Sequence, residues 1–266
     1  MLPTPSTSHV SFDTVYEPAE DSFLFLDTLS SESEASWLTS RFNLDSTPPL
    51  LVEVGSGSGV VIAFAAANAQ HIFGRDDILV LPIDVNHDAC RATRRTVQTA
   101  IAENNDSSTG SSKNQGQQQT QFVGSVMADL VSALKPGSVD VLLFNPPYVP
   151  TPDVPPTPST GSTTRDTATL SRSEKFEYES YLLSLSYAGG ADGMEITNRF
   201  IDAIPSTLNP ERGVAYLLLC AQNKPEQVKA RIVQDWQGWT AEIVGRSGVK
   251  AGWEKLVILR ICREET

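Results

Sequence analysis

The stretch LVEVGSGSGVV, residues 51–61, decides the fold of this chain. It reads as a short apolar strand that runs into closely spaced glycines and then into an apolar helix. Glycine is needed where a backbone turns tightly and lies close to a ligand. Gly55, Gly57 and Gly59 have the spacing G-x-G-x-G, which differs from the G-x-G-x-x-G of dinucleotide-binding loops. The stretch therefore predicts a strand–loop–helix unit with a ligand at its turn.

The alternation of strand and helix patterns continues along the chain. Strands are expected at 49–55, 77–84, 120–126, 140–145 and 213–220, and helices at 58–70, 87–103, 174–187, 194–207 and 225–236. Near-continuous apolar strands of this kind predict a mostly parallel sheet with helices on both faces. The β-rich runs at 240–247 and 254–262 are too close for a helical crossover, so they predict a C-terminal antiparallel hairpin. Together these patterns predict a seven-stranded, Rossmann-like α/β domain.

Residues 1–266 are expected to form a single domain with two segments outside this pattern. The segment 103–121 is polar and low in complexity, which is typical of a disordered surface insertion. The segment 151–175 is rich in proline, serine and threonine, and we expect a long loop that behaves as a lid.

Composition limits the partners and the compartment. The net charge of −12 disfavours nucleic acid as a partner, because binding to phosphates needs a basic face. No apolar run approaches the roughly 18–20 residues that span a bilayer, and the N-terminus lacks the pattern of a secretory signal. The cysteines form no C-x-x-C pair, so no metal site is expected. We expect a cytoplasmic protein, with the nucleus as an alternative.

Carboxylates stand at or just beyond the ends of the first three expected strands. Glu53 precedes the glycine loop and can pair with a cationic group of the ligand, directly or through water. Asp84 ends the second strand, where an acid can accept both hydroxyls of a ribose. Asp129 follows the third strand, and it can hold an adenine amino group or cap a helix. Because ligands in open α/β sheets lie at the carboxyl ends of the strands, these acids predict a nucleoside-type cofactor.

The fourth expected strand ends in FNPPY, residues 144–148. An amide or exocyclic nitrogen is a poor nucleophile because its lone pair is delocalised. The side-chain oxygen of Asn145 and the carbonyl of Pro146 can each accept one N–H of such a group and so orient it for attack on a methyl sulfonium. Pro146 has no competing N–H, and Tyr148 can stack on a flat substrate group. A simple Asn-Pro turn is the structural alternative.

Four motifs together resemble the HemK-like glutamine N5-methyltransferases, and most closely their eukaryotic release-factor branch. They are VYEPAEDSF (15–23), LVEVGSGSGVV (51–61), FNPPYVPTP (144–152) and YAGGADGMEI (187–196). The resemblance implies a class I methyltransferase fold, S-adenosylmethionine as methyl donor and S-adenosylhomocysteine as product. The long segment after Pro150 departs from the shorter loop of that family.

The resemblance also implies roles for individual residues. Residues expected to contact or close over the cofactor are Tyr16, Glu20, Asp21, Ser22, Glu53, Gly55, Gly57, Asp84, Asp129 and Asn145. Residues expected to hold the glutamine amide are Asn145, Pro146, Pro147 and Tyr148, of which Asn145, Pro146 and Tyr148 would be catalytic.

The partners implied by the resemblance are a class-1 translation termination factor, methylated on the glutamine of its Gly-Gly-Gln motif, and a small zinc-binding activator. The expected third strand, 120–126, is apolar and lacks the Lys or Pro that usually protects a sheet edge, so we expect the activator to bind there. Alternatives are a nucleic-acid adenine N6-methyltransferase, a lysine-methylating side activity, and a scaffold subunit with a degenerate fold.

Overall fold

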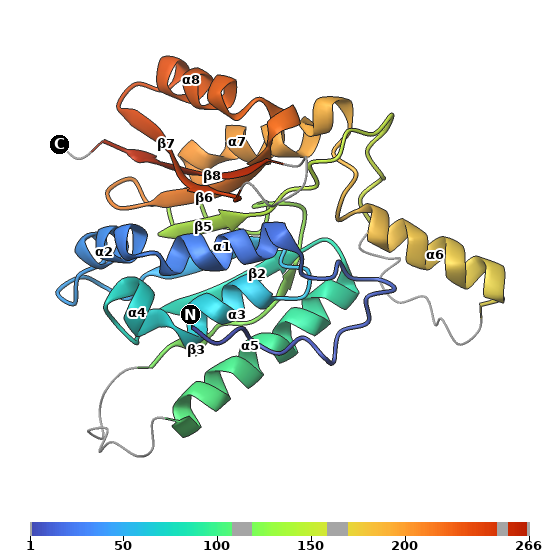
Figure 1. Cartoon of the computed structure of the whole chain (residues 1–266), viewed down its shortest axis with the longest axis horizontal. Helices are drawn as coiled ribbons and strands as arrows, with labels where there is room; N and C mark the ends of the chain where they lie inside the picture. The colour runs from blue at the N-terminus through green and yellow to red at the C-terminus, as the bar shows by residue number, and fades with distance from the viewer. Residues whose placement is uncertain (1, 108–118, 159–169, 249–254, 265–266) are drawn as a thin grey trace.

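A computed structural model describes residues 2–107, 119–158, 170–248 and 255–264 (Figure 1). Its strands are β1 (Leu50–Val54), β2 (Leu79–Asp84), β3 (Gln121–Phe122), β4 (Val126–Met127), β5 (Val141–Phe144), β6 (Val214–Cys220), β7 (Trp239–Arg246) and β8 (Leu256–Arg263). Its helices are α1 (Glu20–Ser30), α2 (Glu32–Arg41), α3 (Val60–Ala67), α4 (Ala69–Phe73), α5 (His87–Ser107), α6 (Arg172–Ser184), α7 (Glu195–Thr207) and α8 (Pro225–Asp235). None of the helices in the described ranges is long and apolar enough to cross a membrane.

All the strands join in one sheet, in the order β3-β2-β1-β5-β6-β8-β7, with β4 also paired to β2. β1 pairs in parallel with β2 and with β5, and β5 pairs in parallel with β6. β8 pairs antiparallel with both β6 and β7. The predicted fold class, a mostly parallel sheet that ends in an antiparallel hairpin, is confirmed.

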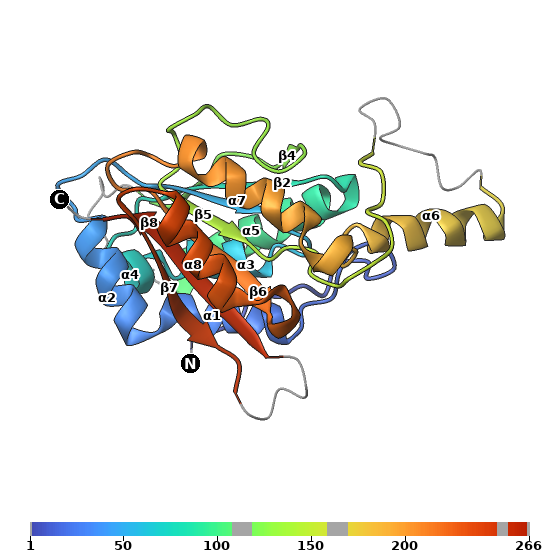
Figure 2. The same ribbon diagram turned by 90° about the horizontal axis from the view of Figure 1, so that it is seen from above.

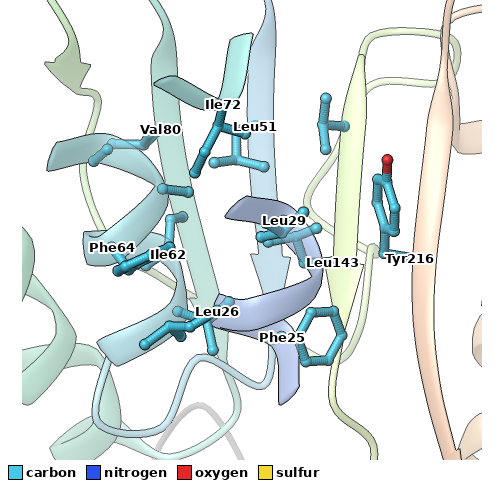
Figure 3. Close-up of a cluster of buried hydrophobic side chains, with 14 of the residues drawn as sticks. Phe25, Leu26, Leu29, Leu51, Ile62, Phe64, Ile72, Val80, Leu143 and Tyr216 are labelled. Carbon is cyan, nitrogen blue, oxygen red and sulfur yellow. The ribbon is translucent and has the colours of Figure 1, made fainter. Parts of the chain in front are cut away.

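Alternate residues of the central strands build two hydrophobic cores, one on each face of the sheet. Leu51 and Leu143 face a cluster formed with α1 to α5, which Figure 3 shows between helices and sheet. Val52 and Leu142 face a second cluster formed with α7 and α8. Because both faces are covered, the ends of the strands are the part of the sheet left for a ligand.

Two sequence expectations need correction. The third strand is not continuous over 120–126, because β3 and β4 are two short pieces on either side of Gly124, which adopts φ +150°. Both pieces pair in parallel with β2, so they form one edge of the sheet. In addition, α1 and α2 were not expected, and they cover the sheet beside α3 and α4 (Figure 1).

The structure describes part of each of the two segments expected outside the domain. Helix α5 continues to Ser107, so the first residues of 103–121 are helical, and 108–118 lie outside the described residues. Residues 159–169 of the second segment also lie outside them. Its last residues begin α6, where Ser171 and Glu174 form a capping box. Figures 1 and 2 show α6 projecting from the body of the molecule.

Candidate active site

A cavity of about 160 Å³ lies at the carboxyl ends of β1, β2 and β5. Ten of the predicted site residues line it: Tyr16, Asp21, Ser22, Glu53, Gly55, Gly57, Asp84, Asp129, Asn145 and Pro147. Glu20, Pro146 and Tyr148 are not among the lining residues. Glu20 is exposed, Pro146 is buried, and Tyr148 is half-buried against the hydrophobic cluster beneath α1 to α5. The structure thus brings ten of the expected residues together at one cavity, and the other three lie beside it.

The glycine loop wraps one wall of the cavity. Gly55, Gly57 and Gly59 have φ of +63°, +52° and +79°, in the left-handed region that favours glycine. A Cβ added to Gly57 would meet no atom within 4 Å, so the bare backbone faces open space. A Cβ at Gly59 would instead lie 2.7 Å from the Cα of Thr93 in α5. Gly59 therefore allows close helix packing, and Gly57 leaves room beside the cavity.

Glu53 connects the loop to helix α3. Its carboxylate Oε2 accepts a hydrogen bond of 3.1 Å from the backbone N–H of Ile62, in the first turn of that helix. The helix begins after Gly59, which has no side chain to cap it, so the acid on the preceding strand supplies the acceptor. Glu53 is only 4% exposed, and burial, followed by repulsion from Asp84, raises its pKa well above the ordinary value. A nearby cation would stabilise the ionised form.

The side chain of Asp84, at the end of β2, accepts hydrogen bonds from the glycine loop after β1 and from the turn after β2. Its Oδ2 accepts from the N–H of Gly57 at 2.9 Å, and its Oδ1 accepts from the N–H of Asn86 at 2.8 Å. Burial raises the pKa of Asp84, and these backbone hydrogen bonds oppose the rise. Each oxygen retains a second lone pair, so the carboxylate can still accept from two hydroxyl groups of a ligand.

Asp129 at the far wall forms an ion pair that its sequence position did not indicate. Its Oδ2 lies 2.5 Å from a guanidinium nitrogen of Arg199, on α7. Arg199 lines the same cavity, and both side chains are partly exposed. The two residues are 70 positions apart, so only the packing of α7 against the sheet brings them together. The carboxylate that was expected to hold an adenine amino group therefore already has a cationic partner.

Asn145 follows β5 directly, and a carboxylate fixes the orientation of its amide. The Nδ2 of Asn145 donates to Asp21 Oδ2 at 3.0 Å. Asp21 is 3% exposed, and its other oxygen accepts from the backbone N–H of Ser22 at 2.6 Å. Because an ionised carboxylate can only accept, Asn145 must turn its NH₂ toward Asp21. Asn145 Oδ1 is then buried without a hydrogen-bond partner.

The N-terminal part of the cavity wall begins two residues earlier than Tyr16, the first residue expected there. Thr14 and Val15 are buried and line the cavity ahead of Tyr16. Asn86 holds them in place, since its Nδ2 donates to the carbonyl of Thr14 at 2.7 Å. No local pattern indicates this contact, because it joins residues 72 positions apart.

The lining residues fit a cationic nucleoside such as S-adenosylmethionine. The open space at Gly57 gives room for a ligand against the backbone, and the buried carboxylates of Glu53 and Asp84 provide acceptors and negative charge. Across the described ranges, no group of three or more His, Cys, Asp or Glu side chains is placed to hold a metal ion. The arrangement can bind a cofactor at β1 and β2 and present an unpaired amide oxygen at β5.

Comparison with known proteins gives the family. No protein-family model matches the chain. The mouse protein named Methyltransferase HEMK2 is 33% identical over 98% of this chain and 97% of its own length. The fission yeast protein named eRF1 methyltransferase catalytic subunit mtq2 is 31% identical over 99% of this chain and 96% of its own. The solved N-terminal domain of human METTL16 in complex with SAH is 14% identical, with a TM-score of 0.48, over 94% of this chain and 74% of that domain. From its near full-length identity to the mouse and yeast proteins, the chain belongs to the HEMK2-type, HemK-like family of methyltransferases.

Proposed function

We propose that this chain transfers a methyl group from S-adenosylmethionine to the side-chain amide nitrogen of a glutamine. The protein substrate is a class-1 translation termination factor, and the glutamine is that of its Gly-Gly-Gln motif. The name of the fission yeast relative, which refers to eRF1, supports the termination factor as substrate. A cytoplasmic location agrees with a role in translation and is part of the proposal.

The observation that carries the proposal is the unpaired oxygen of Asn145. A buried acceptor without a partner costs about 1–3 kcal/mol, so it favours an incoming N–H donor. A glutamine side-chain amide carries two such N–H donors on the nitrogen that is methylated. The carbonyl of Pro146 is the proposed second acceptor, because a proline supplies an acceptor without a competing donor.

The residues of the chain would act by positioning and by charge. Bound S-adenosylmethionine supplies an electrophilic methyl group. Asp21 holds the amide of Asn145 so that its oxygen accepts from the substrate N–H, which aims the nitrogen lone pair at the methyl group. Glu53 and Asp84 hold the cationic amino acid part and the ribose of the cofactor. The methylated nitrogen gives up its proton after transfer, so no strong base is required at the site.

A labelled-methyl assay tests the proposal with three acceptors: the termination factor, the same factor with its Gly-Gly-Gln glutamine substituted, and a DNA oligonucleotide. We expect label in the first acceptor alone. Label in DNA would support the adenine N6-methyltransferase instead, and label that survives loss of the glutamine would support lysine methylation or another site. Transfer to no acceptor and no thermal stabilisation by S-adenosylmethionine would support the scaffold alternative.

The variant Asn145→Ala separates binding from transfer in the same assay. We expect the cofactor to stabilise the variant as it stabilises the unsubstituted protein, because Glu53 and Asp84 remain. Transfer should fall by about two orders of magnitude, since one of the two acceptors is lost. Equal transfer by the variant, or loss of cofactor binding, would contradict the role assigned to Asn145.

The proposal includes a small zinc-binding activator at the β3–β4 edge of the sheet. Gln121 and Val123 are exposed there, and Val123 is 58% exposed. An apolar edge without a protecting charge favours pairing with another chain. Copurification tests this part separately: Val123→Lys should weaken association with the activator. Full solubility and full activity of the isolated chain would contradict it.

A further inference from the structure

The loop Asn145–Tyr148 has few donors of its own with which to hold its shape. Pro146 and Pro147 carry no N–H, so the loop must be fixed largely through its carbonyl groups. A donor from another part of the chain can hold such a carbonyl. The structure provides one for the carbonyl of Tyr148, from the turn that follows β6.

Asn223 ends the short 3-10 turn Ala221–Asn223 and is 3% exposed. Its Oδ1 accepts from the backbone N–H of Cys220 at 2.9 Å, which fixes the orientation of the amide. Its Nδ2 then faces the carbonyls of Asp192 at 3.2 Å, Gly193 at 3.4 Å and Tyr148 at 3.5 Å. One side chain thus joins three segments that are far apart in sequence.

Glycines bring the 187–193 segment directly against the loop. A Cβ at Gly189 would lie 2.3 Å from the carbonyl oxygen of Pro147, and a Cβ at Gly193 would lie 2.0 Å from that of Tyr148. Neither position could therefore carry a side chain without moving the loop. Backbone hydrogen bonds continue the contact, since Val149 N donates to Tyr187 O at 3.0 Å and Gly189 N donates to Val149 O at 2.9 Å.

We infer that Asn223 is a positioning residue for methyl transfer, which holds the Asn145–Tyr148 loop and the 187–193 segment in one arrangement from behind the cavity. Asn223 does not line the cavity, so it acts through the loop and not on the ligand. The inference rests on the proposed function, because the loop is given the task of holding the glutamine amide. It adds a residue just beyond the carboxyl end of β6 to the residues that set the geometry of transfer.

The test is the isosteric substitution Asn223→Asp. Its carboxylate can still accept from Cys220 N, but it replaces the NH₂ donor with an acceptor that faces three carbonyl oxygens. We expect kcat, counted per cofactor-binding site, to fall about ten- to hundredfold, with the affinity for S-adenosylmethionine changed less than about twofold. Asn223→Ala removes the donor without adding a charge and should reduce kcat in the same direction by less.

Two controls separate this role from a loss of folding. Gln222→Glu adds the same charge at the exposed neighbouring position and should leave kcat unchanged. In an Asn145→Ala background, Asn223→Asp should reduce kcat less than it does alone, because one of the two acceptors on the loop that it positions is already absent. Unchanged kcat per binding site in both Asn223 variants, or fully additive losses in the double variant, would overturn the inference. Failure of the unsubstituted protein to methylate glutamine would overturn the proposed function first.

Discussion

The contact between Asp21 and Asn145 gives the sharpest prediction for the chemistry. In Asp21→Asn the volume is kept, but one acceptor oxygen becomes an NH₂ donor. The original carboxylate serves three donors: its Oδ1 accepts from Ser22 N at 2.6 Å and Ser22 Oγ at 3.3 Å, and its Oδ2 accepts from Asn145 Nδ2 at 3.0 Å. An amide oxygen at position 21 can face either Ser22 or Asn145 but not both. The backbone of Ser22 cannot move away, so Asn145 is the partner that turns its oxygen toward the new NH₂.

The expected loss follows from that rotation. A turned Asn145 presents a donor to the substrate amide where an acceptor is needed. A hydrogen bond that involves a charged group contributes about 1.5–3 kcal/mol, which corresponds to about 10- to 150-fold in rate. We expect kcat for glutamine methylation to fall by that factor in Asp21→Asn, measured by single-turnover transfer of labelled methyl groups.

The matched control is Asp27→Asn, which makes the same change at an exposed position of the same helix and should leave kcat unchanged. Cofactor affinity is measured in parallel by calorimetry, because Asp21 also lines the cavity. If Asp21→Asn kept its kcat within about twofold, the positioning of Asn145 by Asp21 would be refuted. If only cofactor affinity fell, Asp21 would be a cofactor-binding residue, as the family resemblance implies, and not a residue that positions Asn145.

Two further predictions concern the protonation of Glu53 at the cofactor site and the buried contacts of Glu34 with Tyr216 and Arg260. Because burial raises the pKa of Glu53, this group is protonated in the free protein over a range above the ordinary carboxyl pKa, and a cationic cofactor favours its ionised form. Cofactor binding should therefore release a proton and strengthen as pH rises through that range, and calorimetry should show the dependence weakened in Glu53→Gln. Glu34→Ala should reduce the free energy of unfolding by about 3–5 kcal/mol in denaturant titrations, because it leaves the Tyr216 hydroxyl and the Arg260 guanidinium without their buried acceptor. Glu242→Gln removes only the charge of the 57% exposed partner of Arg260, so it should change the free energy of unfolding by less than about 1 kcal/mol. Equal losses of stability in Glu34→Ala and Glu242→Gln would contradict the role of burial.

The sequence predicted the parts of this molecule that depend on local pattern. The ends of β1, β2 and β5 follow from apolar runs that stop at glycine, aspartate and asparagine, and the parallel sheet brings those ends together. What it did not predict depends on contacts between distant residues. Asn145 and Asp21 are 124 positions apart, and no periodicity relates them.

The errors have physical causes. Helix α2 was missed although Ser31 caps it by accepting from the N–H of Glu34, a local helix signal. The burial of Glu34 against Tyr216 and Arg260 depends on distant residues and has no local signal. The strand at 120–126 looked continuous because its side chains favour a strand, but the backbone departs from the sheet at Gly124. At 120–126 the backbone conformation of Gly124 overrides the local strand preference.

The hydrogen bond from Ile62 to Glu53 has a consequence for reading the relatives of this protein. A homologue that had lost catalysis would still need an acid at that position to complete the first turn of α3. An intact glutamate before the glycine loop is therefore poor proof that a relative is an active enzyme. Asp21 has a similar second role, because it accepts from the backbone N–H of Ser22 in the first turn of α1. The side chain of Asn145 follows a strand, and its oxygen is left without a partner in the protein. A homologue without catalysis would gain by replacing Asn145, so an intact Asn145 is the better marker of retained activity.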